Sequence, residues 1–238
     1  MTNPLESLLV VQDHDVALDR LRHRRDTLPE RAALAAVLAE AATVAARTQA
    51  VTAERDTLAR EETRLDDEAR TLEARAKDVE AKMYSGEVSS PRELQAMQAD
   101  VEQLQRHRRD VENRELEVME QREPFDAELA SLADRRAALA ADATALGATI
   151  ASAEAEIDAE AQVERDARDA LTADLDAALL AAYEQRRANA QGVGIARLVG
   201  TTCQGCHLTI PSTEAQRIKH APEGSIESCD NCGCILVP

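Results

Sequence analysis

Four cysteines in the last part of the chain are the residues most able to do chemistry. Cys203 and Cys206 form one CxxC pair, Cys229 and Cys232 form a second, and 22 residues separate the two pairs. Each pair lets two thiolates on one tight turn reach the same ion, and two pairs complete a tetrahedron around Zn²⁺ that leaves no position for water. The spacing therefore predicts one structural zinc ion. Redox-active or disulfide-bonded thiols are the alternative.

Three further side chains of metal-binding type lie close to these pairs. Cys234 follows Cys232 by two residues, so we expect it on the next strand with its thiol pointing away from the metal. It could also replace Cys232, because a CxC pair can reach one ion. His207 and His220 are ligands by type, and we expect both to be solvated or to lie beside the ligands without binding the metal.

Residues 195–238 are expected to form a small zinc ribbon around these cysteines. Gly205 and Gly233 lie in or beside the two CxxC turns, where the backbone needs positive φ or room for amide-to-sulfur hydrogen bonds. A segment of this size cannot build a stable core unaided, so metal binding must supply much of its folding free energy. Gly192 and Gly194 are expected to form a flexible joint before the ribbon. Short strands are expected at the apolar positions of the ribbon, which are Ile195, Leu198, Val199, Leu208, Ile210, Ile226, Ile235, Leu236 and Val237.

The composition predicts a mainly α protein without a thick core. Tyr84, Phe125 and Tyr183 are the only aromatic residues among 238, and such a composition is typical of long helices that bury a narrow apolar seam. No apolar run approaches the roughly 20 residues of a membrane span, and the first residues lack the pattern of a signal peptide. We therefore expect a cytoplasmic protein, whose reduced thiols would be free for zinc.

The remainder of the chain, residues 1–190, is predicted to be a long antiparallel coiled-coil hairpin. Residues 3–6 and 90–93 each combine a polar cap, a proline at the first helical position and a following glutamate, which is a helix start. Between them, residues 84–91 contain glycine and serines and predict a tip loop. At 1.5 Å per residue, an arm of about 80 residues would be about 120 Å long.

A repeat of steps of three and four residues predicts the seam of this hairpin. Seven of eight positions between 58 and 83 are apolar, as are fifteen of nineteen between 94 and 157. A sustained period of 3.5 residues favours a left-handed supercoil. Pro29 and Pro124 interrupt the helical pattern, so we expect kinks near Leu28 and Glu123. The polar interruptions of the second register are Arg108, Glu115, Arg122 and Arg136.

No catalytic residues are predicted. The chain has no GxSxG, HExxH or phosphate-binding glycine motif. Its many carboxylates lie on helical faces where they would pair with arginines four residues away. We therefore interpret the chain as non-enzymatic, because four thiolates leave no open metal position for a reaction.

Arginines near the predicted ribbon raise the alternative of nucleic-acid binding. Arg186, Arg187 and Arg197 could contact phosphates. Against this, the net charge of −17 disfavours attraction to nucleic acid or anionic lipid, and aromatic stacking platforms are nearly absent. Protein binding is the leading hypothesis.

Two segments resemble bacterial C4-type zinc ribbon domain proteins, which consist of a coiled-coil hairpin and a ribbon. Residues 83–97 resemble the hairpin tip of this family, and residues 200–211 with 229–236 resemble its ribbon. Members are described as partners of an alternative sigma factor and, in flagellated bacteria, as regulators that bind a messenger RNA. The resemblance implies an adaptor near gene expression, with a sigma factor or RNA polymerase as partner. Asp230 and Cys234 depart from the family's usual proline and basic residue.

The hypothesis is thus an adaptor that presents a hairpin tip and a zinc ribbon to protein partners, as a monomer or a homodimer. A tyrosine, a glycine and capped serines make the tip richer than a simple turn requires, although a stable turn is the alternative explanation. We predict that the tip contacts the partner through Tyr84, Ser85, Gly86, Glu87, Ser90, Pro91 and Arg92.

Overall fold

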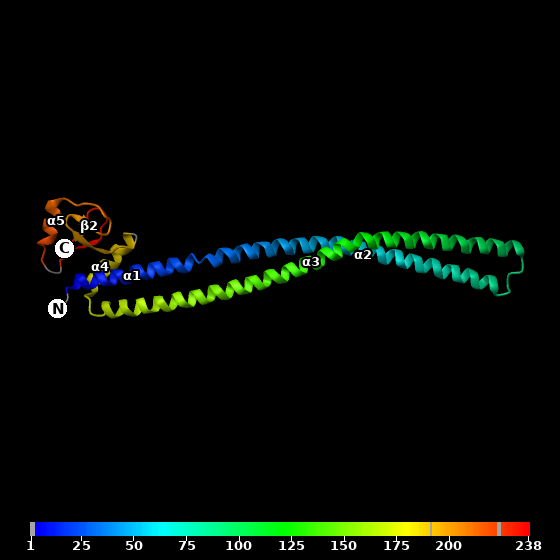
Figure 1. Ribbon diagram of the computed structural model, residues 1–238, viewed down its shortest axis with the longest axis horizontal. Coiled ribbons are helices and arrows are strands. Elements are labelled where there is room, and N and C mark those ends of the chain that lie inside the picture. The colour runs from blue at the N-terminus through cyan, green and yellow to red at the C-terminus, as the bar shows by residue number, and fades with distance from the viewer. Residues whose placement is uncertain (1–2, 191, 223–224) are drawn as a thin grey trace. The chain divides into compact units, whose positions relative to one another are not determined.

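The computed structural model describes residues 3–190, 192–222 and 225–238, which are mainly helical (Figure 1). The chain forms two compact units, one of residues 1–32 with 146–238 and one of residues 33–145. The elements in chain order are α1 (Pro4–Asp26), α2 (Pro29–Tyr84), α3 (Pro91–Thr172), α4 (Ala177–Asn189), β1 (Ile195–Val199), β2 (Thr202–Cys203), α5 (Ser212–Lys219) and β3 (Ile235–Val237).

Both predicted helix starts are confirmed. The side chain of Asn3 accepts a hydrogen bond from the backbone N–H of Leu5 at 3.0 Å, and proline occupies the first turn of α1. The carbonyl of Ser90 accepts from the N–H groups of Glu93 and Leu94, both at 3.1 Å, at the start of α3. These bonds satisfy groups that a helix end otherwise leaves without partners.

The two prolines act differently from each other. Pro29 does not kink a continuous helix: α1 ends at Asp26 and Pro29 begins α2. Proline is tolerated at that position because the first N–H groups of a helix have no intrahelical acceptor. Pro124 lies inside α3, which remains one helix from Pro91 to Thr172. The kink predicted near Leu28 is thus a break between two helices, whereas α3 continues past Glu123 without a break, and the kink expected there stays a prediction.

In the unit of residues 33–145, α2 and α3 pair as the predicted antiparallel hairpin (Figure 1). Leu65, Ala69 and Leu72 of α2 and Val111 of α3 form one buried cluster. Every position of the predicted register between 94 and 157 is buried or partly buried except Arg136. The 3.5-residue repeat therefore identified the face of α3 that is turned inward.

Ion pairs link α2 and α3, and one of them joins two polar interruptions of the seam. Glu62 interrupts the register of α2 and Arg122 that of α3, and Arg122 donates a hydrogen bond to Glu62. Arg47 donates to both carboxylate oxygens of Glu128, at 2.6 and 2.8 Å. Such pairs fix the register more than they add stability, because partly exposed ion pairs contribute about 0–1 kcal/mol.

In the other unit, a three-stranded sheet has the order β2-β1-β3. β1 pairs antiparallel with β2 and parallel with β3, with Ile195 opposite Ile235. One face of the sheet packs into the ribbon core through residues such as Leu198 and Leu236. The other face packs on α1 and α4, where Ile195 and Ile235 join a buried cluster with Leu8. The ribbon is thus seated on the helices of its unit.

Gln12 of α1 holds the segment that leads into the ribbon. Its side chain is 6% exposed; the amide nitrogen donates to the carbonyl of Gly192 at 2.9 Å and the amide oxygen accepts from the N–H of Gly194 at 2.7 Å. A Cβ at position 194 would lie 2.7 Å from the ring of Tyr183. The expected flexible joint is therefore wrong: the glycines permit a close approach that hydrogen bonds then fix.

Asp15, which is 3% exposed, organises the same junction. It accepts from the Tyr183 hydroxyl at 2.6 Å and from Nε of Arg168 at 2.8 Å, so α1, α3 and α4 meet at one carboxylate. Burial and the negative Asp15 both raise the pKa of Tyr183 well above its ordinary value. The hydroxyl therefore remains a donor to Asp15 at neutral pH.

One stretch within Pro4–Tyr84 is long and apolar enough to cross a membrane by length and composition, among the residues that the structure describes. The sequence had predicted no such stretch. A single one is weak evidence, because core helices of soluble proteins meet the same criterion. The alanine-rich sequence of α2 accounts for it.

Candidate metal centre

The two CxxC turns have the same backbone hydrogen bonds. In the first, the N–H of His207 donates to the carbonyl of Cys203 at 2.8 Å, and the N–H of Cys203 donates to the carbonyl of Leu208 at 3.1 Å. In the second, Gly233 donates to the carbonyl of Cys229 at 2.7 Å, and Cys229 to that of Cys234 at 2.9 Å. Each turn thus directs its two cysteine side chains to one side.

His207 and Gly233 occupy equivalent positions and both have positive φ, of 60° and 75°. Gly233 adopts this conformation without steric cost, whereas His207 does so as a residue with a Cβ. Gly205 does not have positive φ. It provides room instead, because a Cβ there would lie 3.1 Å from that of Ala196. Positive φ, the first predicted reason, therefore applies to Gly233, whereas Gly205 is needed for close packing against neighbouring side chains, and room for amide-to-sulfur hydrogen bonds stays a prediction.

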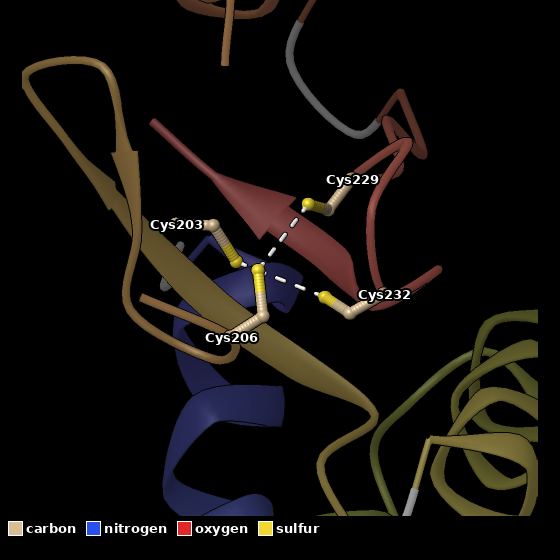
Figure 2. A group of neighbouring side chains, drawn as sticks. All are labelled: Cys203, Cys206, Cys229 and Cys232. Carbon is tan, nitrogen blue, oxygen red and sulfur yellow. Dashed lines mark hydrogen bonds between the residues drawn. The ribbon is translucent and has the colours of Figure 1, made fainter. Parts of the chain in front are cut away.

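The four sulfur atoms converge from these turns on one point (Figure 2). They all lie within 4.8 Å of one another, and the Cys203–Cys232 and Cys206–Cys229 separations are both 3.9 Å. A tetrahedral ion with Zn–S bonds of about 2.3 Å requires sulfur atoms about 3.8 Å apart. The predicted ligands therefore fit a single structural Zn²⁺, with two of the sulfur pairs already close to the tetrahedral separation.

Burial affects the ionisation of one candidate ligand, Cys232. It raises the pKa of the Cys232 thiol to about 12, because a desolvated site disfavours thiolates. Zn²⁺ stabilises thiolates and displaces their protons, so binding would release protons and would weaken at low pH. Four thiolates close the coordination sphere, and the ion would hold the ribbon together without reacting.

Cys234 does not point away from the site, as the sequence suggested. Its Sγ lies 3.3 Å from that of Cys232 and 3.6 Å from that of Cys203. The expectation failed because it placed Cys234 on the following strand, whereas β3 begins only at Ile235. Five thiols thus occupy one cluster.

The histidines lie outside the group of sulfur ligands, as expected. His207 and His220 are both exposed. Nδ1 of His220 donates to the carbonyl of Gln216 at 2.8 Å, at the end of α5. The cysteines therefore make up the candidate ligand set found among the described residues.

Comparison with known proteins agrees with this geometry. Residues 11–191 match the model of the CT398-like coiled coil hairpin domain, and residues 202–236 match the C4-type zinc ribbon domain. This chain belongs to the CT398-like hairpin family. The predicted resemblance to hairpin proteins with a C4-type ribbon is confirmed.

The chain is also similar to mycobacterial proteins. The uncharacterized protein Rv2229c of Mycobacterium tuberculosis H37Rv is 32% identical over 231 residues, which cover 97% of this chain and 94% of the relative. A structure from Mycobacterium smegmatis is 28% identical, with a TM-score of 0.88 over 100% of this chain and 98% of that one.

CT398 from Chlamydia trachomatis shares the fold at 18% identity. Its TM-score is 0.71 over 98% of this chain and 96% of that chain. The HP0958 protein from Helicobacter pylori is 16% identical, with a TM-score of 0.53 over 99% and 97% of the two chains. At these identities the likeness shows the fold alone.

The CT398-like hairpin exposes its tip loop between α2 and α3. Tyr84 is 84% exposed. The hydroxyl of Ser85 donates to the carbonyl of Lys82 at 2.9 Å and accepts from the N–H of Glu87 at 3.2 Å, and Gly86 has φ of 82°. Local bonds therefore form the turn, and the tyrosine side chain is not used in it. The remaining predicted tip residues, Ser90, Pro91 and Arg92, are also exposed.

The three arginines considered for nucleic-acid binding contact other side chains of this chain. Arg197 donates to both carboxylate oxygens of Glu6, at 2.9 and 2.5 Å. Arg187 donates to Asp19 at 2.5 Å, and Arg186 to the hydroxyl of Ser228 at 3.1 Å. Phosphate would have to compete with these partners.

Two features of the junction and ribbon were not predicted. α5 follows the first CxxC turn and buries Ala215 and Ile218 in the ribbon core; the spacing of three between them was its available signal. The contacts of Gln12 and Asp15 carry no local signal, because their partners lie more than 150 residues away.

Proposed function

We propose that this chain is a non-enzymatic adaptor that binds a protein partner through its hairpin tip. The observation that carries the proposal is Tyr84, whose side chain is 84% exposed at a loop that closes without it. Exposed tyrosines are enriched at protein interfaces, because the ring adds apolar contact area at a low entropic cost. The tip thus has a side chain suited to recognition.

The ribbon provides the second part of the scaffold. Its four cysteines fit a closed zinc site, and a closed site stabilises a fold without binding substrate. Because β1 and β3 pack on α1 and α4, zinc would also maintain the surface that the ribbon adds to its helices. We therefore assign to the zinc ion the role of keeping the ribbon folded for partner binding.

The class of partner rests on the family resemblance. A gene-expression complex, with a sigma factor or RNA polymerase as the direct contact, is the proposed partner, and the cytoplasm the proposed location. Internal pairing of Arg187 and Arg197 with carboxylates supports protein over nucleic acid as the ligand. The adaptor is expected to be a monomer or a homodimer, and its molar mass in solution would distinguish the two.

Affinity capture with matched variants tests the proposal. The natural chain and Tyr84→Ala would be tagged in the source organism, and retained proteins quantified after nuclease treatment. Leu116→Ala is the control, because it removes an apolar side chain that is 56% exposed on α3, outside the tip. We expect Tyr84→Ala to lose a specific protein that both other chains retain.

Two outcomes would reject the tip as the partner site. Equal retention by Tyr84→Ala and the control would mean that the loop is only a stable turn. Loss of all specific material on nuclease treatment would favour the nucleic-acid alternative. In that case affinity should fall steeply with salt, and Arg186→Ala, Arg187→Ala and Arg197→Ala should weaken it.

A further inference from the structure

The fifth thiol of the cluster lies as close to two ligands as the ligands lie to each other. Cys234 Sγ is 3.3 Å from Cys232 Sγ and 3.6 Å from Cys203 Sγ, compared with 3.9 Å between Cys203 and Cys232. Cys234 is also fully buried, at 0% exposure, whereas Cys232 is partly exposed. A sulfur donor thus stands beside the metal position, protected from solvent.

The surrounding backbone holds this thiol in place. The carbonyl of Cys234 accepts from the N–H of Cys229 at 2.9 Å, which ties it to the second CxxC turn. On the other side, a Cβ built at Gly205 would lie 3.2 Å from Cys234 Sγ, so the thiol packs directly against the first turn. The equivalent residue of that first turn is Leu208, which is exposed. The inward direction is therefore particular to position 234.

We propose that Cys234 is an alternate zinc ligand that can take the place of Cys232, while Cys203, Cys206 and Cys229 remain bound. In the exchange, the Zn–S bond to Cys232 breaks and a Zn–S bond to Cys234 forms. The proton of the Cys234 thiol passes to the departing Cys232 thiolate across 3.3 Å. Four thiolates bind the ion before and after, so the charge of the site does not change and no oxidant is needed.

The exchange follows from the geometry of the CxC segment. Thiolates separated by one residue can reach the same ion under ordinary metal-site spacing. Cys234 Sγ already lies 3.6 Å from the sulfur of Cys203, which stays bound, so the incoming sulfur starts beside one of the retained ligands. Cys206 and Cys232 are both partly exposed and could be hydrated when released, and Cys232 is the ligand that leaves because its sulfur lies 3.3 Å from that of Cys234.

Serine substitutions in the full chain test this assignment, with zinc content and Co²⁺ absorbance as readouts. Thiolate-to-Co²⁺ charge-transfer bands report how many sulfurs bind. We expect Cys232→Ser to keep one zinc ion and a four-thiolate Co²⁺ spectrum, with affinity within about tenfold of the natural chain. Cys206→Ser and the double variant Cys232→Ser/Cys234→Ser should lose the four-thiolate spectrum and at least about a hundredfold in affinity. Equal loss in Cys232→Ser and Cys206→Ser would overturn the proposal.

If Cys232→Ser does not fold, alkylation of the zinc-bound chain tests the ligand exchange instead. Iodoacetamide should modify the partly exposed thiols, Cys206 and Cys232, and mass spectrometry identifies the protein that is modified only at Cys232. In the natural chain we expect singly modified protein to retain zinc, because Cys234 replaces the blocked thiol. In Cys234→Ser the same modification should release zinc. Release from both chains would show that Cys234 cannot substitute.

Discussion

The hydroxyl of Tyr183 offers a direct test of the helix junction. It donates to Asp15 at 2.6 Å, and both residues are buried. Tyr183→Phe removes this donor and keeps the ring that packs between α4 and the sheet. Asp15 would retain Arg168 at 2.8 Å, but its second oxygen would have only Arg187 nearby, at 3.8 Å. A buried carboxylate oxygen would then lack a short hydrogen bond.

The size of the effect follows from the charge of the acceptor. Hydrogen bonds to charged groups contribute about 1.5–3 kcal/mol, and a buried acceptor left without its donor bears a desolvation cost of similar size. For a chain of this length, 1 kcal/mol corresponds to about 2–4 °C in Tm. We therefore expect Tyr183→Phe to lower Tm by about 3–12 °C.

Thermal unfolding followed by circular dichroism would measure this change, with Tyr84→Phe as the matched control. Tyr84 is the other tyrosine of the chain and is 84% exposed, so the same substitution there should leave Tm within about 1 °C. If Tyr183→Phe and Tyr84→Phe had the same Tm, the argument that the hydrogen bond to Asp15 stabilises the junction would be refuted.

Three further measurements address the junction and the metal. The pKa of Tyr183 lies above its ordinary value of 10.0, so above about pH 10 the folded chain keeps a proton that the unfolded chain loses. The free energy of unfolding should therefore fall as the pH rises above about 10, and it should fall less in Tyr183→Phe. Gly194→Ala should lower the free energy of unfolding, measured by chemical denaturation, by about 1–3 kcal/mol, because its Cβ would meet the Tyr183 ring at 2.7 Å. The control is Gly147→Ala, inside α3, where the added Cβ would have no atom within 4 Å; it should raise the free energy of unfolding by up to about 1 kcal/mol. Chelation or Cys206→Ser should unfold the ribbon and expose it to proteases while most of the helical circular dichroism remains; an equally resistant ribbon without zinc would contradict the structural role.

The features that the sequence predicted well depend on short spacings. The CxxC pairs, the caps at Asn3 and Ser90 and the 3.5-residue repeat each involve residues within one or two turns of one another, so their geometry follows from local backbone rules. The repeat also identified the inward face of α3, including the interruption at Arg122 that meets Glu62.

The features that were missed depend on distant partners or on short segments. The glycines before the ribbon indicated a flexible joint because nothing nearby in the sequence reveals that Gln12 binds them. Cys234 was placed on the following strand with its thiol pointing away from the metal, whereas β3 starts one residue after it, at Ile235. α5 has only eight residues, too few for its apolar spacing to stand out.

The seating of the ribbon on α1 has a consequence for synthesis of the chain. Leu5, Leu8 and Val11 are made more than 170 residues before the side chains that cover them, such as Tyr183 and Ile235. At about 5–20 residues per second, the ribosome needs roughly 10–40 s to supply them. During that interval an apolar helix face stays uncovered in the cell, so newly made chains should be most prone to aggregate, and most in need of a chaperone, before the last strand emerges.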